Sequence, residues 1–300
     1  MNRKAASNPA EKRISCLPLA MPISYQQLVN NWSVQLTQYE SNEAQNLVNW
    51  LLEHHLGLRR VDMMHFLEEN NLPQVLKADF EKLKSGMPIQ YILGHGPFYG
   101  REFLVTTDTL IPRNETEELV HLIIKENPKP GLKILDVGTG TGCIPISLAL
   151  DMNSPEVYAL DISEKALKIA SENAKNLHAK VIFSKCDILK KIPQVKELDI
   201  LVSNPPYIPI EEKGQMHSNV LDHEPDLALF VSDEDPLIFY RIISEKGKKL
   251  LKPTGKIYFE INERFGKAVS ELLLALGYQK VRIIKDLNGK DRMVAGQISL

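Results

Sequence analysis

The stretch ILDVGTGTG, residues Ile134–Gly142, decides how this chain folds. An apolar run ends around Asp136, and glycines follow at positions 138, 140 and 142, which is typical of a buried strand that turns tightly into a helix. Glycine permits the tight turn and lets a ligand touch the backbone, and the next helix directs its first amide groups into the same gap. By itself, however, the motif is equally compatible with a strand, turn and helix that bind no ligand.

Around this motif, short apolar strands alternate with amphipathic helices from residue 114 to residue 300. We expect helices at 115–127, 143–151, 163–177, 236–251 and 264–277, and strands at 132–138, 156–161, 180–187, 197–204, 255–261, 280–286 and 291–298. This alternation predicts an α/β fold with a mostly parallel, seven-stranded sheet covered on both faces. The last two strands flank Asn288–Gly289, a strong hairpin signal, which predicts one antiparallel strand at the end of the sheet.

The region before residue 114 has a different character. Residues 24–86 read as a small helical domain with helices at 25–36, 43–56, 61–70 and 74–86, and we interpret it as a substrate-recognition domain. Ser24 and Asn42 are the expected N-caps of the first two helices, and Gly57 is expected to end the second. Residues 87–113 predict a β-hairpin linker that turns at Tyr99–Gly100.

Composition restricts the class of protein. The chain has 300 residues, 43% hydrophobic and 25% charged, with a net charge of -2, which argues against a strongly basic nucleic-acid binder. Its three cysteines and eight histidines form neither a C-x-x-C pair nor an H-E-x-x-H motif, so we expect no disulfide framework and no metal site. No apolar run approaches the length of a membrane span. We expect a cytoplasmic protein.

The N-terminal extension, residues 1–23, is expected to be disordered. It is polar and basic and lacks the apolar core of a signal peptide. Residues 1–20 are compatible with a transit peptide, in which case the protein would be organellar, and Met21 is an alternative start.

Two carboxylates point to a nucleoside ligand. Asp161 ends the second strand of the α/β region, 23 positions after Gly138, where it can accept hydrogen bonds from both ribose hydroxyls. Asp187 ends the third strand at the same sheet edge and is placed to hold an adenine amino group. The glycine spacing is G-x-G-x-G, and no G-K-[ST] is present, which disfavours NAD and ATP and suits S-adenosylmethionine.

The fourth strand of the α/β region, expected at 197–204, leads into the sequence NPPY, residues Asn204–Tyr207. A residue before proline is held extended, and both prolines have fixed φ angles, so Asn204 and the carbonyl of Pro205 form a rigid pair of acceptors. Such a pair suits an NH2 group on an sp2 carbon, because it orients the nitrogen and stabilises the positive charge that develops on alkylation. Tyr207 is expected to stack on the flat face of that group. The alternative is a proline-rich turn without a ligand.

Together, NPPY and ILDVGTGTG resemble the class I S-adenosylmethionine-dependent methyltransferases, whose domain is Rossmann-like. More narrowly, PIQYILG, FYGREFLV, LIPRNETEELV, SNPPYI and HEPDLAL are similar to the protein-(glutamine-N5) methyltransferases of peptide chain release factors. That resemblance runs from about residue 24 to the C-terminus. It implies methylation of the glutamine in the Gly-Gly-Gln motif of class I release factors, with S-adenosylmethionine as cofactor.

The resemblance also implies the functional residues. Cofactor contacts carry over to Gly138, Thr139, Gly140, Thr141, Gly142, Asp161, Asp187, Ile188 and Asn204. Substrate contacts carry over to Asn204, Pro205, Pro206 and Tyr207, with Asn204, Pro205 and Tyr207 in the catalytic role, and Arg113 is expected at the entrance. Many relatives have an aromatic residue at the position of Ile188, so an adenine stacking contact is expected to be missing.

Several alternatives stay open at this point. A ribosomal-protein glutamine methyltransferase or a DNA or RNA adenine-N6 methyltransferase would use the same NPPY corner, and a non-catalytic module would keep the fold alone. The expected partners are class I release factors, without direct nucleic acid or membrane contact, and the expected state is a monomer.

Overall fold

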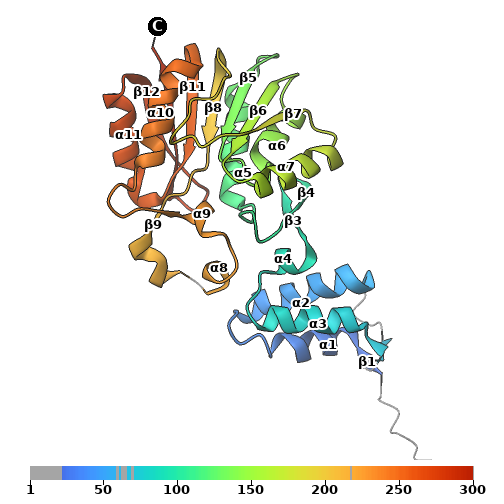
Figure 1. Ribbon diagram of the computed structural model, residues 1–300. Coiled ribbons are helices and arrows are strands. Elements are labelled where there is room, and N and C mark those ends of the chain that lie inside the picture. Colours follow the sequence, from blue (N-terminus) through green and yellow to red (C-terminus); the bar gives the residue numbers. More distant parts are fainter. Residues whose placement is uncertain (1–21, 59–60, 62–65, 69–70, 217, 300) are drawn as a thin grey trace, which may run out of the picture. The chain divides into compact units, whose positions relative to one another are not determined.

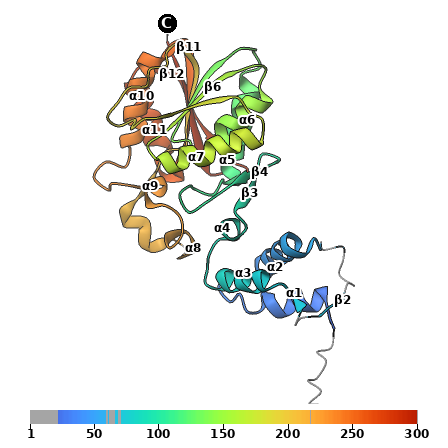
Figure 2. The ribbon, with the colours of Figure 1, turned by 45° about the vertical axis from the view of Figure 1, so that its right-hand side comes forward.

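The computed structural model describes residues 22–58, 61, 66–68, 71–216 and 218–299. The expected extension 1–23 and transit peptide 1–20 therefore lie outside the described residues, apart from residues 22 and 23. The chain divides into two compact units after Lys84, and each is described by itself (Figures 1 and 2). Among the described helices, none is long and apolar enough to cross a membrane.

The N-terminal unit contains α1 (Tyr25–Ser33), α2 (Ser41–Leu56) and α3 (Gln74–Lys84). Ser24 caps α1 through a capping box with Gln27, as expected, and Gly57 ends α2 in the left-handed conformation. The N-cap of α2 is Glu40 rather than Asn42. Apolar faces meet in a core in which the rings of Trp32 and Phe80 stack 4.1 Å apart.

The prediction of a helix at 61–70 is wrong for residues 66 and 67, which the structure describes. Phe66–Leu67 forms a short strand, β2, which pairs antiparallel with β1 (Ile23–Ser24). The backbone groups of these residues thus find partners on a segment about forty positions away, and that pairing overrides the local helical pattern.

The second unit begins with α4 (Ile89–Leu93) and the hairpin of β3 (His95–Phe98) and β4 (Arg101–Leu104). Tyr99 and Gly100, at the predicted turn, both have positive φ, 48° and 74°, as a two-residue hairpin of the primed type requires. Asn173 holds the hairpin in place, since its side chain accepts from the amide of Leu104 and donates to the Leu104 carbonyl.

A seven-stranded sheet forms the centre of this unit, in the order β12-β13-β11-β8-β5-β6-β7. The strands are β5 (Lys133–Val137), β6 (Glu156–Asp161), β7 (Val181–Lys185), β8 (Leu198–Ser203), β11 (Leu251–Glu260), β12 (Tyr278–Lys285) and β13 (Asp291–Ile298). Five adjacent strands, β11, β8, β5, β6 and β7, are parallel, so their carboxyl ends meet at one edge.

Helices cover both faces of the sheet (Figure 1). The helices are α5 (Asn114–Glu126), α6 (Cys143–Asp151), α7 (Glu164–Asn176), α10 (Ile238–Leu250) and α11 (Gly266–Ala275). Neighbouring strand residues point to opposite faces: Ile134 packs with α5 and α6, whereas Leu135 packs with α10 and α11. Two apolar layers result, which explains why the central strands β5 and β8 are apolar along nearly their whole length.

The sequence predicted that the antiparallel strand lies at the end of the sheet, and this prediction is wrong. β13 lies between β11 and β12 and runs antiparallel to both. Residues 293–296 of β13 are buried, whereas β12 is mostly exposed after Tyr278. The more apolar strand of the hairpin therefore takes the interior position, where both of its faces are covered.

The segment between β8 and α10 consists of short elements. They are β9 (Ile208–Pro209), the 3-10 helix η3 (Ile210–Gln215), α8 (Ser218–Leu221), α9 (Asp226–Leu229) and β10 (Phe230–Val231), which pairs with β9. A further 3-10 turn, η4 (Glu263–Phe265), precedes α11.

Candidate active site

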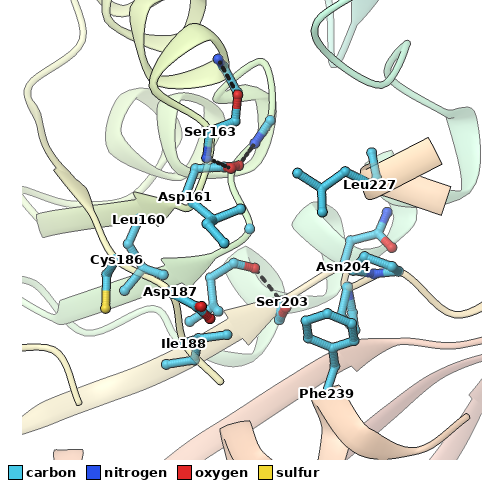
Figure 3. Close-up of a pocket in the computed structure, with 18 of the residues that line it drawn as sticks. Leu160, Asp161, Ser163, Cys186, Asp187, Ile188, Ser203, Asn204, Leu227 and Phe239 are labelled. Carbon is cyan, nitrogen blue, oxygen red and sulfur yellow. Dashed lines mark hydrogen bonds between the residues drawn. The ribbon is translucent and has the colours of Figure 1, made fainter. Parts of the chain in front are cut away.

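A cavity of about 460 Å³ opens at the carboxyl ends of the parallel strands (Figure 3). This is the edge at which ligands of open α/β sheets bind. Figure 3 shows Asp161 and Ser163 on one side of the cavity and Asn204, Leu227 and Phe239 on the other. Eight residues predicted from the sequence line the cavity: Gly138, Gly140, Asp161, Asp187, Ile188, Asn204, Pro205 and Pro206.

The glycine loop leaves β5 and is fixed to the neighbouring strand. The backbone amides of Gly138 and Thr139 both donate to the carbonyl of Leu160, at 2.9 and 3.0 Å. Gly138 and Gly140 have φ of 78° and 54°, and no atom lies within 4 Å of where a Cβ would stand on either. Since both line the cavity, that free space is available to a ligand in contact with the backbone.

Gly142 has a different role from the first two glycines. It is the N-cap of α6, with φ of 81°, and a Cβ there would lie 3.1 Å from the Cβ of Ala170. Asn173 adds a hydrogen bond of 2.9 Å to the carbonyl of Thr141. Gly142 therefore allows α6 and α7 to approach closely, which holds the loop in shape.

Asp161 is oriented by two backbone amides. Its Oδ2 accepts from Gly140 at 2.9 Å and its Oδ1 accepts from Ser163 at 2.9 Å. Burial raises the pKa of Asp161, although these amides act in the opposite direction. The carboxylate keeps lone pairs free at the cavity wall, as a ribose-binding residue requires.

Asp136, one residue before the end of β5, is completely buried. Neither carboxylate oxygen has a hydrogen-bond partner among the described residues. Burial raises the pKa of Asp136 to about 7, and nearby Asp161 adds to the rise. Asp136 is not part of the cavity lining, so the groups that fit a nucleoside such as S-adenosylmethionine are the open backbone of Gly138 and Gly140 and the carboxylate of Asp161.

The loop after β7 forms another wall of the cavity. Asp187 accepts a hydrogen bond of 3.0 Å from the amide of Leu189, and Ile188 is buried. Lys246 of α10 donates to the carbonyls of Ile188 and Lys191 and so fastens this loop to α10. Figure 3 shows Asp187 and Ile188 near each other at this wall.

The NPPY corner directly follows β8. Ser203, the last residue of that strand, donates to the carbonyl of Val137 at 2.7 Å, which ties the corner to the start of the glycine loop. The side chain of Asn204 donates from Nδ2 to Thr116 Oγ1 of α5 at 3.3 Å. The amide nitrogen is thus engaged, and Asn204 is held at the cavity wall.

Tyr207 lies beyond the cavity-lining part of the corner. Its hydroxyl donates to Glu260 Oε1 at 3.3 Å, and burial raises the pKa of its phenol, with the charge of Glu260 as the second cause. Glu260 also accepts from Thr116 Oγ1 at 2.7 Å. A single buried carboxyl therefore contacts both the tyrosine of the corner and the residue that holds Asn204.

Arg113 pairs with a buried acid. Its Nη2 lies 2.6 Å from Oε1 of Glu224, whose side chain is 1% exposed. Glu224 belongs to the segment that contributes Pro225, Leu227 and Ala228 to the cavity wall. The ion pair therefore links the N-terminus of α5 to the segment that borders the cavity.

Five predicted site residues are not part of the cavity lining: Thr139, Thr141, Gly142, Tyr207 and Arg113. Sequence reasoning missed Thr116, Glu260 and Phe239. Glu260 could have been predicted as a site residue, because it lies within the apolar strand end IYFEI and a buried carboxylate requires hydrogen-bond or ionic partners. Within the described residues, no cluster of His, Cys, Asp or Glu suited to a metal ion occurs.

Comparison with known proteins agrees with this geometry. Residues 128–287 match the family described as "Methyltransferase domain", and residues 27–94 match the "PrmC N-terminal domain". A release factor glutamine methyltransferase from Bacteroides thetaiotaomicron is 51% identical over 71% of this chain and 77% of its own length. One from Flavobacterium psychrophilum is 42% identical over 89% of this chain and 98% of its own length.

The chain belongs to the release factor glutamine methyltransferase family. The resemblance read from the sequence is thereby confirmed. Among solved structures, a methyltransferase from Pyrococcus furiosus aligns with a TM-score of 0.52 at 18% identity, covering 75% of this chain and 98% of that one. That likeness supports the class I fold. Because these relatives are bacterial, the expectation of a transit peptide is not borne out.

Proposed function

We propose that this protein transfers a methyl group from S-adenosylmethionine to the side-chain amide nitrogen, N5, of the glutamine in the Gly-Gly-Gln motif of class I peptide chain release factors. The reaction would support translation termination. One observation carries the proposal: Asn204, Pro205 and Pro206 line the same cavity as the open glycine backbone and Asp161. The hydrogen-bond acceptors for an amide and the residues that would bind a nucleoside thus line the same cavity.

S-adenosylmethionine, when bound, supplies an electrophilic methyl group on a positively charged sulfur. The backbone of Gly138 and Gly140 contacts this cofactor, and Asp161 accepts from the ribose hydroxyls. Asp187 accepts from the adenine amino group, with Ile188 as an apolar wall. We assign the contribution of the two loop threonines, Thr139 and Thr141, and of Gly142 to the shape of the loop.

On the substrate side, Oδ1 of Asn204 and the carbonyl of Pro205 accept the two N–H bonds of the glutamine amide. The amide nitrogen is a poor nucleophile because its lone pair is delocalised, and this arrangement orients the lone pair and stabilises the developing positive charge. Pro206 keeps the corner stiff, and Tyr207 stacks on the carboxamide. The proton leaves after methylation, so the residues need not supply a strong base. Arg113 acts at the entrance through its ion pair with Glu224.

The test offers labelled S-adenosylmethionine with a purified class I release factor, a ribosomal-protein extract or adenine-containing DNA. Mass spectrometry is expected to find one added methyl on the glutamine of the Gly-Gly-Gln peptide. Asn204→Ala is expected to lower kcat by at least about 100-fold and to change the Kd for S-adenosylmethionine by less than about threefold. Exposed Asn176→Ala controls for the same chemical change. Methylation of the DNA or of ribosomal proteins instead would refute the proposal.

The partner assignment follows from the family. Class I release factors are the proposed protein substrates, and we propose that the enzyme acts as a monomer in the bacterial cytoplasm, without nucleic acid or membrane contact. Light scattering of the purified protein, alone and with a release factor, tests the monomer.

A further inference from the structure

A buried hydrogen-bond chain runs from β11 to the catalytic corner. Glu260, at the end of β11, is 1% exposed, and Thr116, in the first turn of α5, is 3% exposed. Thr116 Oγ1 lies 2.7 Å from Glu260 Oε2, and Nδ2 of Asn204 lies 3.3 Å from the same hydroxyl oxygen. The hydrogen-bond chain therefore joins Glu260 to Asn204 through the hydroxyl group of Thr116.

The donor and acceptor at each step of this hydrogen-bond chain follow from the charge of Glu260. A charged carboxylate only accepts hydrogen bonds, so the single proton of the Thr116 hydroxyl is used on Glu260. The Thr116 oxygen can then only accept from Asn204. The Asn204 amide must consequently turn its NH2 group to Thr116 and leave Oδ1 for the cavity.

We propose that Glu260 and Thr116 are positioning residues that set which end of the Asn204 side-chain amide faces the substrate. The proposal rests on the proposed function, in which Oδ1 must accept from the glutamine amide. An amide turned the other way would present two donors to a group that is itself a donor, and the substrate nitrogen would not be held. Tyr207, which donates to the other oxygen of Glu260, is oriented by the same carboxyl.

The charge state of Glu260 then controls the orientation. Protonated Glu260 can donate to Thr116, which frees the hydroxyl proton for Oδ1 of Asn204 and allows the opposite orientation. Burial raises the pKa of Glu260 to about 7, so this change falls in an accessible pH range. The ionisable groups that interact with Glu260 from neighbouring elements are Tyr207, Arg292, Glu115, Cys143 and Tyr240. Among these, Arg292 favours the charged form and Glu115 opposes it.

The first test is kinetic, on a release factor substrate that wild-type enzyme methylates. Thr116→Val keeps the shape and removes the hydroxyl, and is expected to lower kcat by about 10- to 100-fold with less than about a threefold change in the Kd for S-adenosylmethionine. Thr116→Ser restores the hydroxyl and is expected to recover kcat to within about threefold. Ser147→Ala removes another buried hydroxyl, which lies outside the cavity lining, and is expected to act as wild type.

The second test needs no turnover. In cofactor-free protein labelled with nitrogen-15 on asparagine, the Asn204 side-chain resonances are assigned by their loss in Asn204→Ala. They are expected to shift with pH around a midpoint near 7, and this shift is expected to vanish in Glu260→Gln and Thr116→Val but to persist in Ser147→Ala. Should Thr116→Val fail to fold, Glu260→Gln carries the same test.

The outcomes separate the two proposals. Full kcat in Thr116→Val, or an Asn204 shift with pH that is unchanged in Glu260→Gln, overturns the positioning role while the proposed function stands. Wild-type enzyme that leaves the Gly-Gly-Gln peptide unmethylated refutes the proposed function, and the resonance measurement still decides whether Glu260 orients Asn204.

Discussion

Asp136 makes the stability of the methyltransferase unit depend on pH. Its carboxyl is fully buried and its pKa rises from an ordinary value of 3.8 to about 7 in the folded protein, chiefly because of burial. Between these values the folded state keeps a proton that the unfolded chain has released. Stability is therefore lost as pH rises through the folded pKa, and it is regained on acidification.

The magnitude follows from the pKa. Each pH unit within the window changes the free energy of unfolding by about 1.4 kcal/mol per proton. Raising the pH from about 5 to about 8 thus removes about 3 kcal/mol through Asp136 alone. Asp136→Asn keeps the shape without the ionisation, so wild-type protein is expected to lose about 3 kcal/mol more than this variant over the same pH interval. Glu260 titrates in a similar window in both proteins, so its contribution cancels in this difference.

The assay must report on the correct unit. Both tryptophans, Trp32 and Trp50, belong to the N-terminal unit, so their fluorescence does not follow unfolding around the sheet. Urea unfolding of cofactor-free protein is instead followed by pulsed hydrogen exchange and mass spectrometry of the peptide that covers β5 (Lys133–Val137). Exposed Glu172→Gln controls for the loss of one negative charge and is expected to parallel wild type. Equal pH dependence in wild type and Asp136→Asn would contradict the reasoning.

Two further predictions concern the cavity and its border. Asp161→Asn places a poorer acceptor opposite the backbone amides of Gly140 and Ser163. The Kd for S-adenosylmethionine, measured by calorimetry, is therefore expected to rise at least about tenfold. An unchanged Kd would show that Asp161 is not part of the cofactor site. Arg113→Met leaves buried Glu224 unpaired and is expected to destabilise the unit by about 1–3 kcal/mol in urea unfolding, a range reduced because Arg113 is one-third exposed. Adding Glu224→Gln to Arg113→Met is expected to recover part of this loss, and an equal or larger loss in the double variant would show that the pairing is not the cause.

Much of the fold was predictable because its signals are local. The central strands of the sheet are short apolar runs, and the hairpin turns carry residues suited to positive φ, such as Gly100 and Gly289. The helix expected at 61–70 failed because the pairing of Phe66–Leu67 with Ile23–Ser24 is not encoded locally. The interior place of β13 likewise depends on which strand is more apolar across a whole sheet.

The sequence by itself determined most helices and strands around the sheet, the open glycine turn and the stiff corner at Asn204, because φ restrictions and apolar periodicity act between near neighbours. Tertiary structure alone decided what surrounds that corner. Thr116 lies 144 positions from Glu260 and 88 from Asn204, and Arg113 lies 111 from Glu224. Such contacts arise only when parallel strands bring their carboxyl ends to one edge. Burial at that edge then raises the pKa values of Asp136 and Glu260.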